Sequence, residues 1–130
     1  MIGIDTTAII DIFKGDESIK GFLENNTEPL AATILNYLEL FFGLDPENPK
    51  HSKEGEYYRE LFKNLYHLNL SQGACEKAAS LNWELRKKGT PIGQFDCIIA
   101  GVLIVNGVKK ILTRNVKHYA NIKELKVVSY

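Results

Sequence analysis

The sequence has only two cysteines in 130 residues, and they are not clustered. Cys75 and Cys97 each stand in an apolar helical context, "ACEKAASL" and "FDCIIAGV". A disulfide-stapled scaffold or a cysteine-based metal site needs more cysteines at closer spacing. We therefore expect two reduced core residues in a cytoplasmic protein.

Long apolar runs are also absent, because no stretch approaches the roughly 18 residues that a membrane-spanning helix needs. The first residues, "MIGID", lack the basic stretch followed by an apolar stretch that marks a signal peptide. We expect no association with a membrane, and we expect Met1 to lead directly into structure.

Net charge is the third feature that is missing, since 16 basic residues cancel 16 acidic ones. A protein that binds nucleic acid strongly and non-specifically gains its affinity by neutralising phosphates, so this balance argues against one. A local basic rim around an acidic site remains compatible with it. The histidines, His51, His67 and His118, are too widely spaced to predict a zinc site.

What is present is the composition of an ordinary soluble domain, with 45% hydrophobic and 25% charged residues. Residues 1–130 are expected to form one domain with one substantial core. Short apolar segments that predict strands alternate with helical patterns. The expected strands are 1–5, 29–33, 66–70, 109–113 and 125–130, and the expected helices are 6–13, 16–26, 34–44, 52–65, 71–88, 94–107 and 116–122. This alternation is typical of an α/β fold with a central, mainly parallel sheet.

Three acidic residues and one amide stand where such a fold places ligands. Asp5 follows the first strand, Asp96 is the only charge in the apolar helix 94–107, and Glu39 lies within the apolar "YLELFFGL". Asn115 follows the fourth strand in "TRN". Sites in parallel sheets lie beyond the carboxyl ends of the strands, so we expect these side chains to meet there.

Each of these residues also has a structural explanation. Asp5 could cap the helix that begins at Thr6, Asp96 could complement a helix dipole, Glu39 could form a salt bridge, and Asn115 could be a turn residue. Together, however, they provide the oxygen ligands that Mg²⁺ or Mn²⁺ prefers. Such ions activate water and stabilise charge on a phosphodiester.

Four segments carry a family resemblance: "IDTTAIIDIF", "ATILNYLELFFGL", "GTPIGQFDCIIAGVLIVNG" and "ILTRNVKHYANIKELKVV". In this order they resemble the sequence blocks of PIN-domain proteins, especially VapC-like toxins. The resemblance implies a three-layer α/β/α sandwich and metal-dependent cleavage of RNA. It also implies a homodimer and a small antitoxin partner.

The same resemblance implies roles for individual residues. Asp5, Glu39 and Asp96 would be the metal ligands, and Asn115 would take the fourth acidic or polar position of the catalytic set. The sequence departs from the family pattern at Thr7, where Asn is frequent, and at Asn115, where Asp is frequent. The neutral Asn115 leads us to expect one tightly held ion and one weak ion.

Other residues are expected to support these ligands. Thr6 and Thr113 would orient a carboxylate or a water, although local backbone hydrogen bonding at strand ends is the more usual role for threonines in such places. Candidate RNA-binding cations lie at a helix end, where they also complement the dipole, and beside Asn115. These cations are Arg86, Lys87, Lys88, Arg114 and Lys117.

Some assignments concern residues outside this set. Trp83 is expected in the core, and Asp11 is expected to face solvent or to support the site indirectly. The aromatic stretch "EYYRELFKNLY", with Phe41 and Phe42, could line a homodimer interface or an antitoxin groove, or could pack between helices.

Three rival functions remain at this stage. A PIN-like module that only binds RNA or protein is favoured by Thr7 and Asn115 and opposed by the three acids. An RNA-processing nuclease that is not a toxin would keep the chemistry. A receiver-like phosphoacceptor domain needs a lysine at the end of a late strand, whereas Lys109 and Lys110 precede theirs.

Overall fold

The computed structural model describes residues 1–130. Its sheet contains five strands, all paired in parallel in the order β3-β2-β1-β4-β5. The strands are β1 (Ile2–Ile4), β2 (Leu30–Thr33), β3 (Tyr66–Leu68), β4 (Lys110–Leu112) and β5 (Lys126–Val128). The predicted parallel sheet is therefore confirmed, and every strand points its carboxyl end to the same edge.

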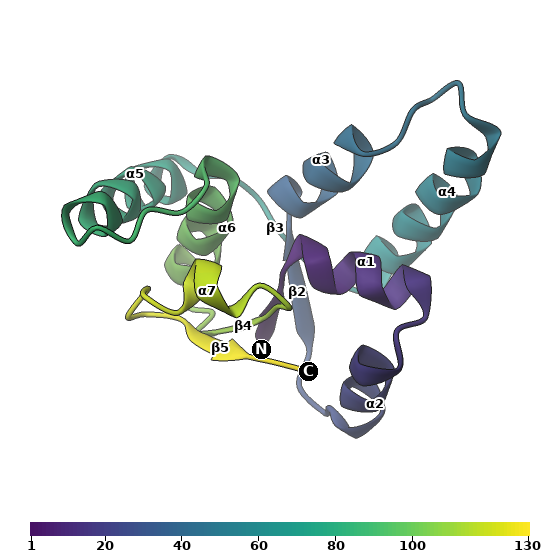
Figure 1. Cartoon of the computed structure of the whole chain (residues 1–130), viewed down its shortest axis with the longest axis horizontal. Coiled ribbons are helices and arrows are strands. Elements are labelled where there is room, and N and C mark those ends of the chain that lie inside the picture. The colour runs from purple at the N-terminus through teal and green to yellow at the C-terminus, as the bar shows by residue number, and fades with distance from the viewer.

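Seven helices connect and cover the strands (Figure 1). They are α1 (Thr6–Lys14), α2 (Glu17–Asn25), α3 (Ile34–Phe42), α4 (Pro49–Lys63), α5 (Gln72–Lys87), α6 (Gln94–Val105) and α7 (Val116–Tyr119). Helix α4 begins three residues earlier than expected because Pro49 suits the first turn and Asn48 accepts a hydrogen bond from the Lys50 amide.

The two faces of the sheet carry separate hydrophobic clusters, which makes the fold a three-layer α/β/α sandwich. Ile111 belongs to the cluster formed with α5, α6 and α7, whereas the next residue, Leu112, belongs to the cluster formed with α1, α2 and α4. Neighbouring strand residues point to opposite faces, so an apolar strand supplies both cores. The predicted sandwich is confirmed.

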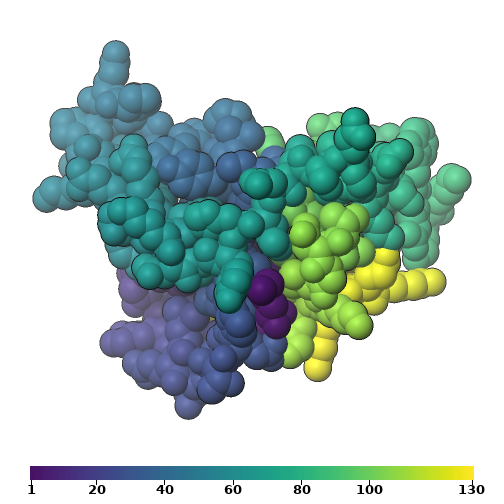
Figure 2. Space-filling model, turned by 180° about the vertical axis from the view of Figure 1, so that it is seen from behind, coloured from purple at the N-terminus to yellow at the C-terminus, as the bar shows by residue number.

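Figure 2 views the molecule from behind, with the start of the chain in dark purple beside the light green residues that lead into β4. This agrees with the parallel pairing of β1 with β4, in which Gly3 opposes Ile111. The carboxyl ends of β1 and β4 consequently lie side by side at the carboxyl edge of the sheet. Asp5 follows β1 there, and Thr113 follows β4.

Predicted helix starts rest on side-chain caps. Thr33 accepts a hydrogen bond from the Asn36 amide at 3.2 Å and forms a capping box with that residue, and Ser71 accepts from the Ala74 amide at 3.1 Å. Asp16 caps α2 in the same way through the Ile19 amide. Caps of this kind satisfy backbone donors that a helix leaves free at its start. The three expected starts are confirmed.

Helices α5 and α6 pack closely against each other. The face of α5 predicted to be buried is buried, and so is Cys97 on α6. The predicted burial of Trp83 and of Cys75 is wrong, because Trp83 is 59% exposed and Cys75 is exposed as well. A helix with one buried face leaves such residues on the solvent side whatever their chemistry.

The aromatic stretch on α4 packs mainly between helices. Tyr58 and Phe62 are buried in the cluster with α1 and α3, whereas Phe42 is 71% exposed and Tyr66 is 57% exposed. Packing therefore accounts for the buried rings, and the exposed rings, which include Tyr57 at 39%, remain available to a partner. No helix combines the length and the apolar character that a bilayer crossing would need.

Candidate functional site

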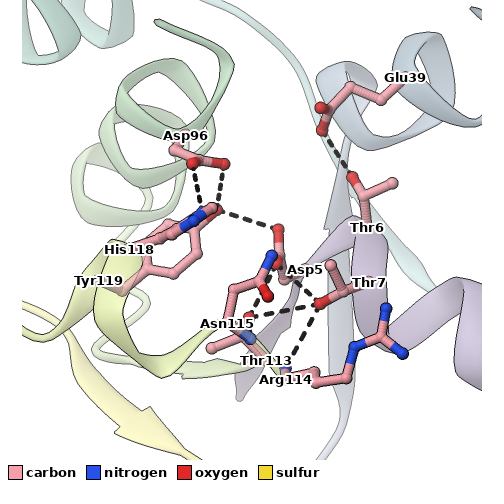
Figure 3. Close-up of polar contacts among 10 residues, drawn as sticks. All are labelled: Asp5, Thr6, Thr7, Glu39, Asp96, Thr113, Arg114, Asn115, His118 and Tyr119. Atoms are coloured by element: carbon pink, nitrogen blue, oxygen red, sulfur yellow. Dashed lines mark hydrogen bonds and ion pairs between the residues drawn. The ribbon is translucent and has the colours of Figure 1, made fainter. Parts of the chain in front are cut away.

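Asp5 forms the centre of a polar network at the carboxyl edge of the sheet (Figure 3). It is 3% exposed. Oδ2 accepts hydrogen bonds from the hydroxyls of Thr113 at 2.8 Å and Thr7 at 3.0 Å, and Oδ1 accepts from the Tyr119 hydroxyl at 3.0 Å. Although Asp5 occupies the N-cap position of α1, its side chain makes no capping bond. The capping explanation is therefore wrong.

Asp96 reaches the same point from the first turn of α6. Its Oδ1 lies 3.1 Å from the Tyr119 hydroxyl, and its Oδ2 lies 2.8 Å from Nδ1 of His118. Burial raises the pKa of Asp96, and the charge of Asp5 raises it further, while His118 and the Tyr119 hydrogen bond oppose the shift. Two carboxylates from distant parts of the chain thus share one phenolic hydroxyl.

Glu39 lies half-buried on α3. Its Oε1 accepts a hydrogen bond from the Thr6 hydroxyl at 2.7 Å, and Thr6 in turn accepts from Asn36 Nδ2 at 3.0 Å. None of the salt bridges of the structure involves Glu39, so the salt-bridge explanation is wrong. Burial raises the pKa of Glu39, the Thr6 bond lowers it, and the charges of Asp5 and Asp96 raise it.

Asn115 lies next to Asp5 in the close-up view (Figure 3). Its backbone amide donates to the Thr113 hydroxyl at 2.9 Å, and its side chain forms no capping bond at the start of α7. The side-chain oxygen is therefore not committed to the local turn. The turn explanation accounts for the backbone of Asn115 but leaves its amide group without a structural role.

The chemistry of this donor set fits a hard divalent cation, since the ligands on offer are carboxylate and amide oxygens. Burial is the main cause that raises the pKa values of Asp96 and Glu39, and nearby carboxylates add to it, so a cation at this edge would stabilise the ionised forms. No three acidic, histidine or cysteine side chains converge closely enough to ligate one ion together. The structure links Asp5 to Asp96 through the Tyr119 hydroxyl and places Glu39 in a separate hydrogen-bonded group with Thr6.

Arg114 is the predicted cation that lies closest to this network. Its backbone amide donates to the Thr7 hydroxyl at 3.4 Å, and its guanidinium donates to Asp11 Oδ1 at 2.9 Å. Asp11 is 3% exposed and also accepts from the Tyr130 hydroxyl at 2.5 Å. The expectation that Asp11 faces solvent is wrong, because it anchors Arg114, whose side chain is 55% exposed.

The other predicted cations are exposed and contact none of the three carboxylates. Lys88 pairs with Glu84 at 3.0 Å, and the guanidinium of Arg86 lies 5.6 Å from the centre of the Trp83 ring. In Figure 1, α5 ends at the left edge of the view and residues 88–93 run back to α6. Lys117 is exposed on α7 and forms no salt bridge. Their binding of RNA stays a prediction.

Sequence reasoning missed His118 and Tyr119 as members of the site, and it noted Thr7 only as a departure from a pattern. Thr7 follows Asp5 by two residues, so proximity in sequence was a usable signal. His118 and Tyr119 lie on the short helix α7, which follows Asn115, and no spacing in the sequence indicated that both side chains reach the acids.

A comparison with protein families decides the assignment. The family model described as "PIN domain" matches residues 2–124. The chain belongs to the PIN domain family. The resemblance seen in its four sequence blocks is thereby confirmed.

This PIN domain also resembles individual proteins. It is 27% identical over 129 residues to the tRNA(fMet)-specific endonuclease VapC of Salmonella typhimurium, and the match covers 95% of this chain and 93% of that protein. The crystal structure of VapBC2 from Rickettsia felis, bound to a DNA fragment from its promoter, matches with a TM-score of 0.83 and 24% identity over 100% of this chain and 99% of that one. A toxin-antitoxin complex from Klebsiella pneumoniae matches with a TM-score of 0.78 and 24% identity over 98% and 96%. The structural matches establish the fold.

Proposed function

We propose that this chain acts as one PIN domain that cleaves RNA phosphodiester bonds with a divalent metal ion, and that it is the toxin of a toxin–antitoxin pair. The observation that carries the proposal is the pairing of Asp5 and Asp96 on the Tyr119 hydroxyl at 3.0 and 3.1 Å, from elements 91 positions apart in sequence. The similarity to an endonuclease named VapC supports it.

Mg²⁺ or Mn²⁺ is the proposed cofactor. Asp5 and Asp96 would hold it directly, Glu39 would bind directly or through a water, and Asn115 would offer a neutral oxygen. When bound, such an ion lowers the pKa of a water and stabilises the charge that develops on the phosphate. The neutral Asn115 again favours one tightly held ion and one weak ion. Calorimetric titration with Mn²⁺ would test this, and two equally tight sites would contradict it.

Side chains of the protein would orient the metal ligands and bind the RNA. Thr113 and Thr7 hold one oxygen of Asp5, and Thr6 holds one oxygen of Glu39, so the carboxylates present fixed lone pairs to the site. Arg114, anchored by Asp11 yet half-exposed, would bind a phosphate of the RNA beside the cleaved bond. Arg86, Lys87, Lys88 and Lys117 would extend the basic rim.

A second candidate function retains the PIN fold without efficient RNA cleavage. The three acids do not converge into one compact cluster, and Asn115 and Thr7 replace residues frequent in the family. A PIN-like module that binds RNA or protein with weak or no cleavage is consistent with these features. An RNA-processing nuclease that is not a toxin would share the site and differ only in biology.

The proposed partners are RNA, a small antitoxin and a second copy of this chain, in the cytoplasm. One apolar row on α3 remains exposed and suits the homodimer: Ile34, Leu38 and Phe42, at 47%, 40% and 71% exposure, recur every four residues. Sedimentation at micromolar concentration tests the dimer. A single species near 14.7 kDa would contradict it.

Two measurements test the function. Purified protein should cleave single-stranded RNA with Mn²⁺ and lose this activity with EDTA, and Asp5→Asn should be inactive under both conditions. Expression in a bacterial host should stop growth, and co-expression of a neighbouring small gene product should relieve the arrest. Metal-dependent cleavage without growth arrest would favour the processing nuclease. Absence of cleavage with retained RNA binding would favour the binding module.

A further inference from the structure

Tyr119 combines a core position with a polar contact at the site. Its side chain is 0% exposed and belongs to the hydrophobic cluster with Leu103 and Ile122. The hydroxyl nevertheless reaches Oδ1 of Asp5 at 3.0 Å and Oδ1 of Asp96 at 3.1 Å (Figure 3). A ring that is fixed by core packing thus holds one atom within 3.1 Å of both carboxylates.

The two contacts cannot both be donated hydrogen bonds at one time. A phenolic hydroxyl carries one proton, and Asp5 and Asp96 offer acceptors when ionised. The carboxylate oxygen that does not receive this proton keeps its lone pairs free, and a divalent cation held by the two acids would accept them.

The remaining oxygen of each acid is held independently. Thr113 and Thr7 donate to Oδ2 of Asp5, and His118 contacts Oδ2 of Asp96. Tyr119 is thus the one side chain that hydrogen-bonds to both acids, and no other hydrogen bond joins them. Hydrogen bonds that orient metal ligands in this way commonly raise metal affinity by roughly 10- to 100-fold.

We propose that Tyr119 is a positioning residue whose hydroxyl holds Asp5 and Asp96 at the spacing that a divalent cation requires. This inference rests on the proposed function, because it takes the two acids as ligands. It adds a residue that acts through them and does not itself touch the RNA. Its effect is expected on metal affinity, with the rate at saturating metal largely retained.

The test compares Tyr119→Phe with wild type by titrating Mn²⁺ and following free Mn²⁺ by electron paramagnetic resonance. The variant keeps the ring and the core packing and removes only the hydroxyl. Its dissociation constant for Mn²⁺ should rise by roughly 10- to 100-fold. In the cleavage assay, the Mn²⁺ concentration for half-maximal rate should rise by a similar factor, while excess Mn²⁺ should restore most of the rate.

Tyr58→Phe is the matched control. Tyr58 is also 0% exposed and also donates to a carboxylate, Oε2 of Glu54 at 2.9 Å, but it lies on α4 outside the site. Its Mn²⁺ affinity should equal that of wild type. Equal affinity in Tyr119→Phe and wild type would overturn the role of Tyr119 and leave the nuclease standing. Failure of wild type to bind Mn²⁺ would overturn the metal site and this inference together.

A measurement on wild type covers the case in which Tyr119→Phe does not fold. Tyrosine rings labelled with ¹³C are observed by NMR while Mn²⁺ is added below one equivalent. A bound paramagnetic ion broadens nearby signals, so the Tyr119 resonance should disappear well before that of Tyr58. Simultaneous loss of both, or persistence of the Tyr119 resonance, would contradict the inference.

Discussion

Thr6 Oγ1 lies 2.7 Å from Glu39 Oε1 and donates a hydrogen bond to it, which ties the start of α1 to the middle of α3. The same hydroxyl accepts from Asn36 one turn earlier on α3. Glu39 is therefore held at the α1–α3 contact, whereas Asp5 and Asp96 share the Tyr119 hydroxyl. The site consists of two hydrogen-bonded groups that meet at the carboxyl edge of the sheet.

Thr6→Val should release Glu39 from this position. The bond from Thr6 lowers the pKa of Glu39 against the upward effect of burial, so its loss should raise that pKa further. An NMR titration of ¹³C-labelled glutamate would measure the change. Thr90→Val, in the loop between α5 and α6, is the control and should leave the titration of Glu39 unchanged. An identical Glu39 curve in Thr6→Val would refute the coupling.

The acids should make the metal-free protein less stable as pH rises toward neutrality. The pKa of Asp96 is raised in the folded protein, chiefly by burial, so the folded state holds a proton that the unfolded chain has already released. Stability from this group is present at acid pH and is lost as pH rises through the raised pKa. Glu39 contributes with the same sign.

Other carboxylates change stability with pH in the opposite direction, such as Glu28 and Glu84, whose pKa values are lowered by lysine partners. Asp96→Asn isolates the contribution of Asp96 from theirs. In EDTA, the variant should gain free energy of unfolding relative to wild type as pH rises from about 4 to 7. Chemical denaturation at several pH values measures the difference. If the difference in free energy of unfolding does not change with pH, the folded state does not raise the pKa of Asp96, and the prediction is wrong.

Gly101 sets the close approach of α5 and α6. A Cβ at this position would lie 2.8 Å from the Ala74 carbonyl oxygen and 2.9 Å from the Ala78 amide nitrogen. Gly101→Ala should therefore lower the free energy of unfolding by about 1 to 3 kcal/mol, because backbone atoms must move apart. Gly21→Ala, within α2 with open space around it, should instead raise it by about 0.5 to 1 kcal/mol. Urea denaturation of both variants measures these changes. An unchanged free energy of unfolding in Gly101→Ala would contradict the close packing of α5 against α6.

Arg114→Ala should weaken RNA binding and reduce its salt dependence. The half-exposed guanidinium would contact one phosphate, so the slope of log affinity against log salt should fall by roughly one. Fluorescence anisotropy in an Asp96→Asn background prevents cleavage during the measurement. Lys109→Ala, before β4 at the opposite edge of the sheet, should have little effect. Equal slopes for Arg114→Ala and the unmodified background would remove Arg114 from the RNA-binding rim.

Much of the fold follows from local pattern. Apolar strands alternating with capped helices predict a parallel sheet, and Thr33 and Ser71 act as the expected caps. Asp5 could be placed at the sheet edge because it directly follows a strand. Positions such as Trp83 could not be predicted, since a bulky apolar residue was taken to be buried although it lies on the outer face of α5.

The finer contacts of the site depend on three-dimensional packing. The reach of the Tyr119 hydroxyl to Asp5 and Asp96 depends on how α7 packs into the core, which no spacing in the sequence expresses. The burial of Asp11 depends on Arg114 and Tyr130, which are more than a hundred residues away. Such long-range pairs leave little trace in the local sequence, and an acidic residue alone is ordinarily expected at the surface.

The most direct test of the proposed function is cleavage of a mixed single-stranded RNA pool by wild type and Asp96→Asn, with Mg²⁺ or Mn²⁺ present or removed by EDTA. Asp45→Asn is the control, because Asp45 is exposed in the loop before α4 and its side chain accepts only a local bond from the Glu47 amide at 2.9 Å. We predict that wild type and Asp45→Asn cleave only with metal and that Asp96→Asn falls to the metal-free background. Equal cleavage by wild type and Asp96→Asn, or no cleavage by wild type, would contradict the proposed nuclease.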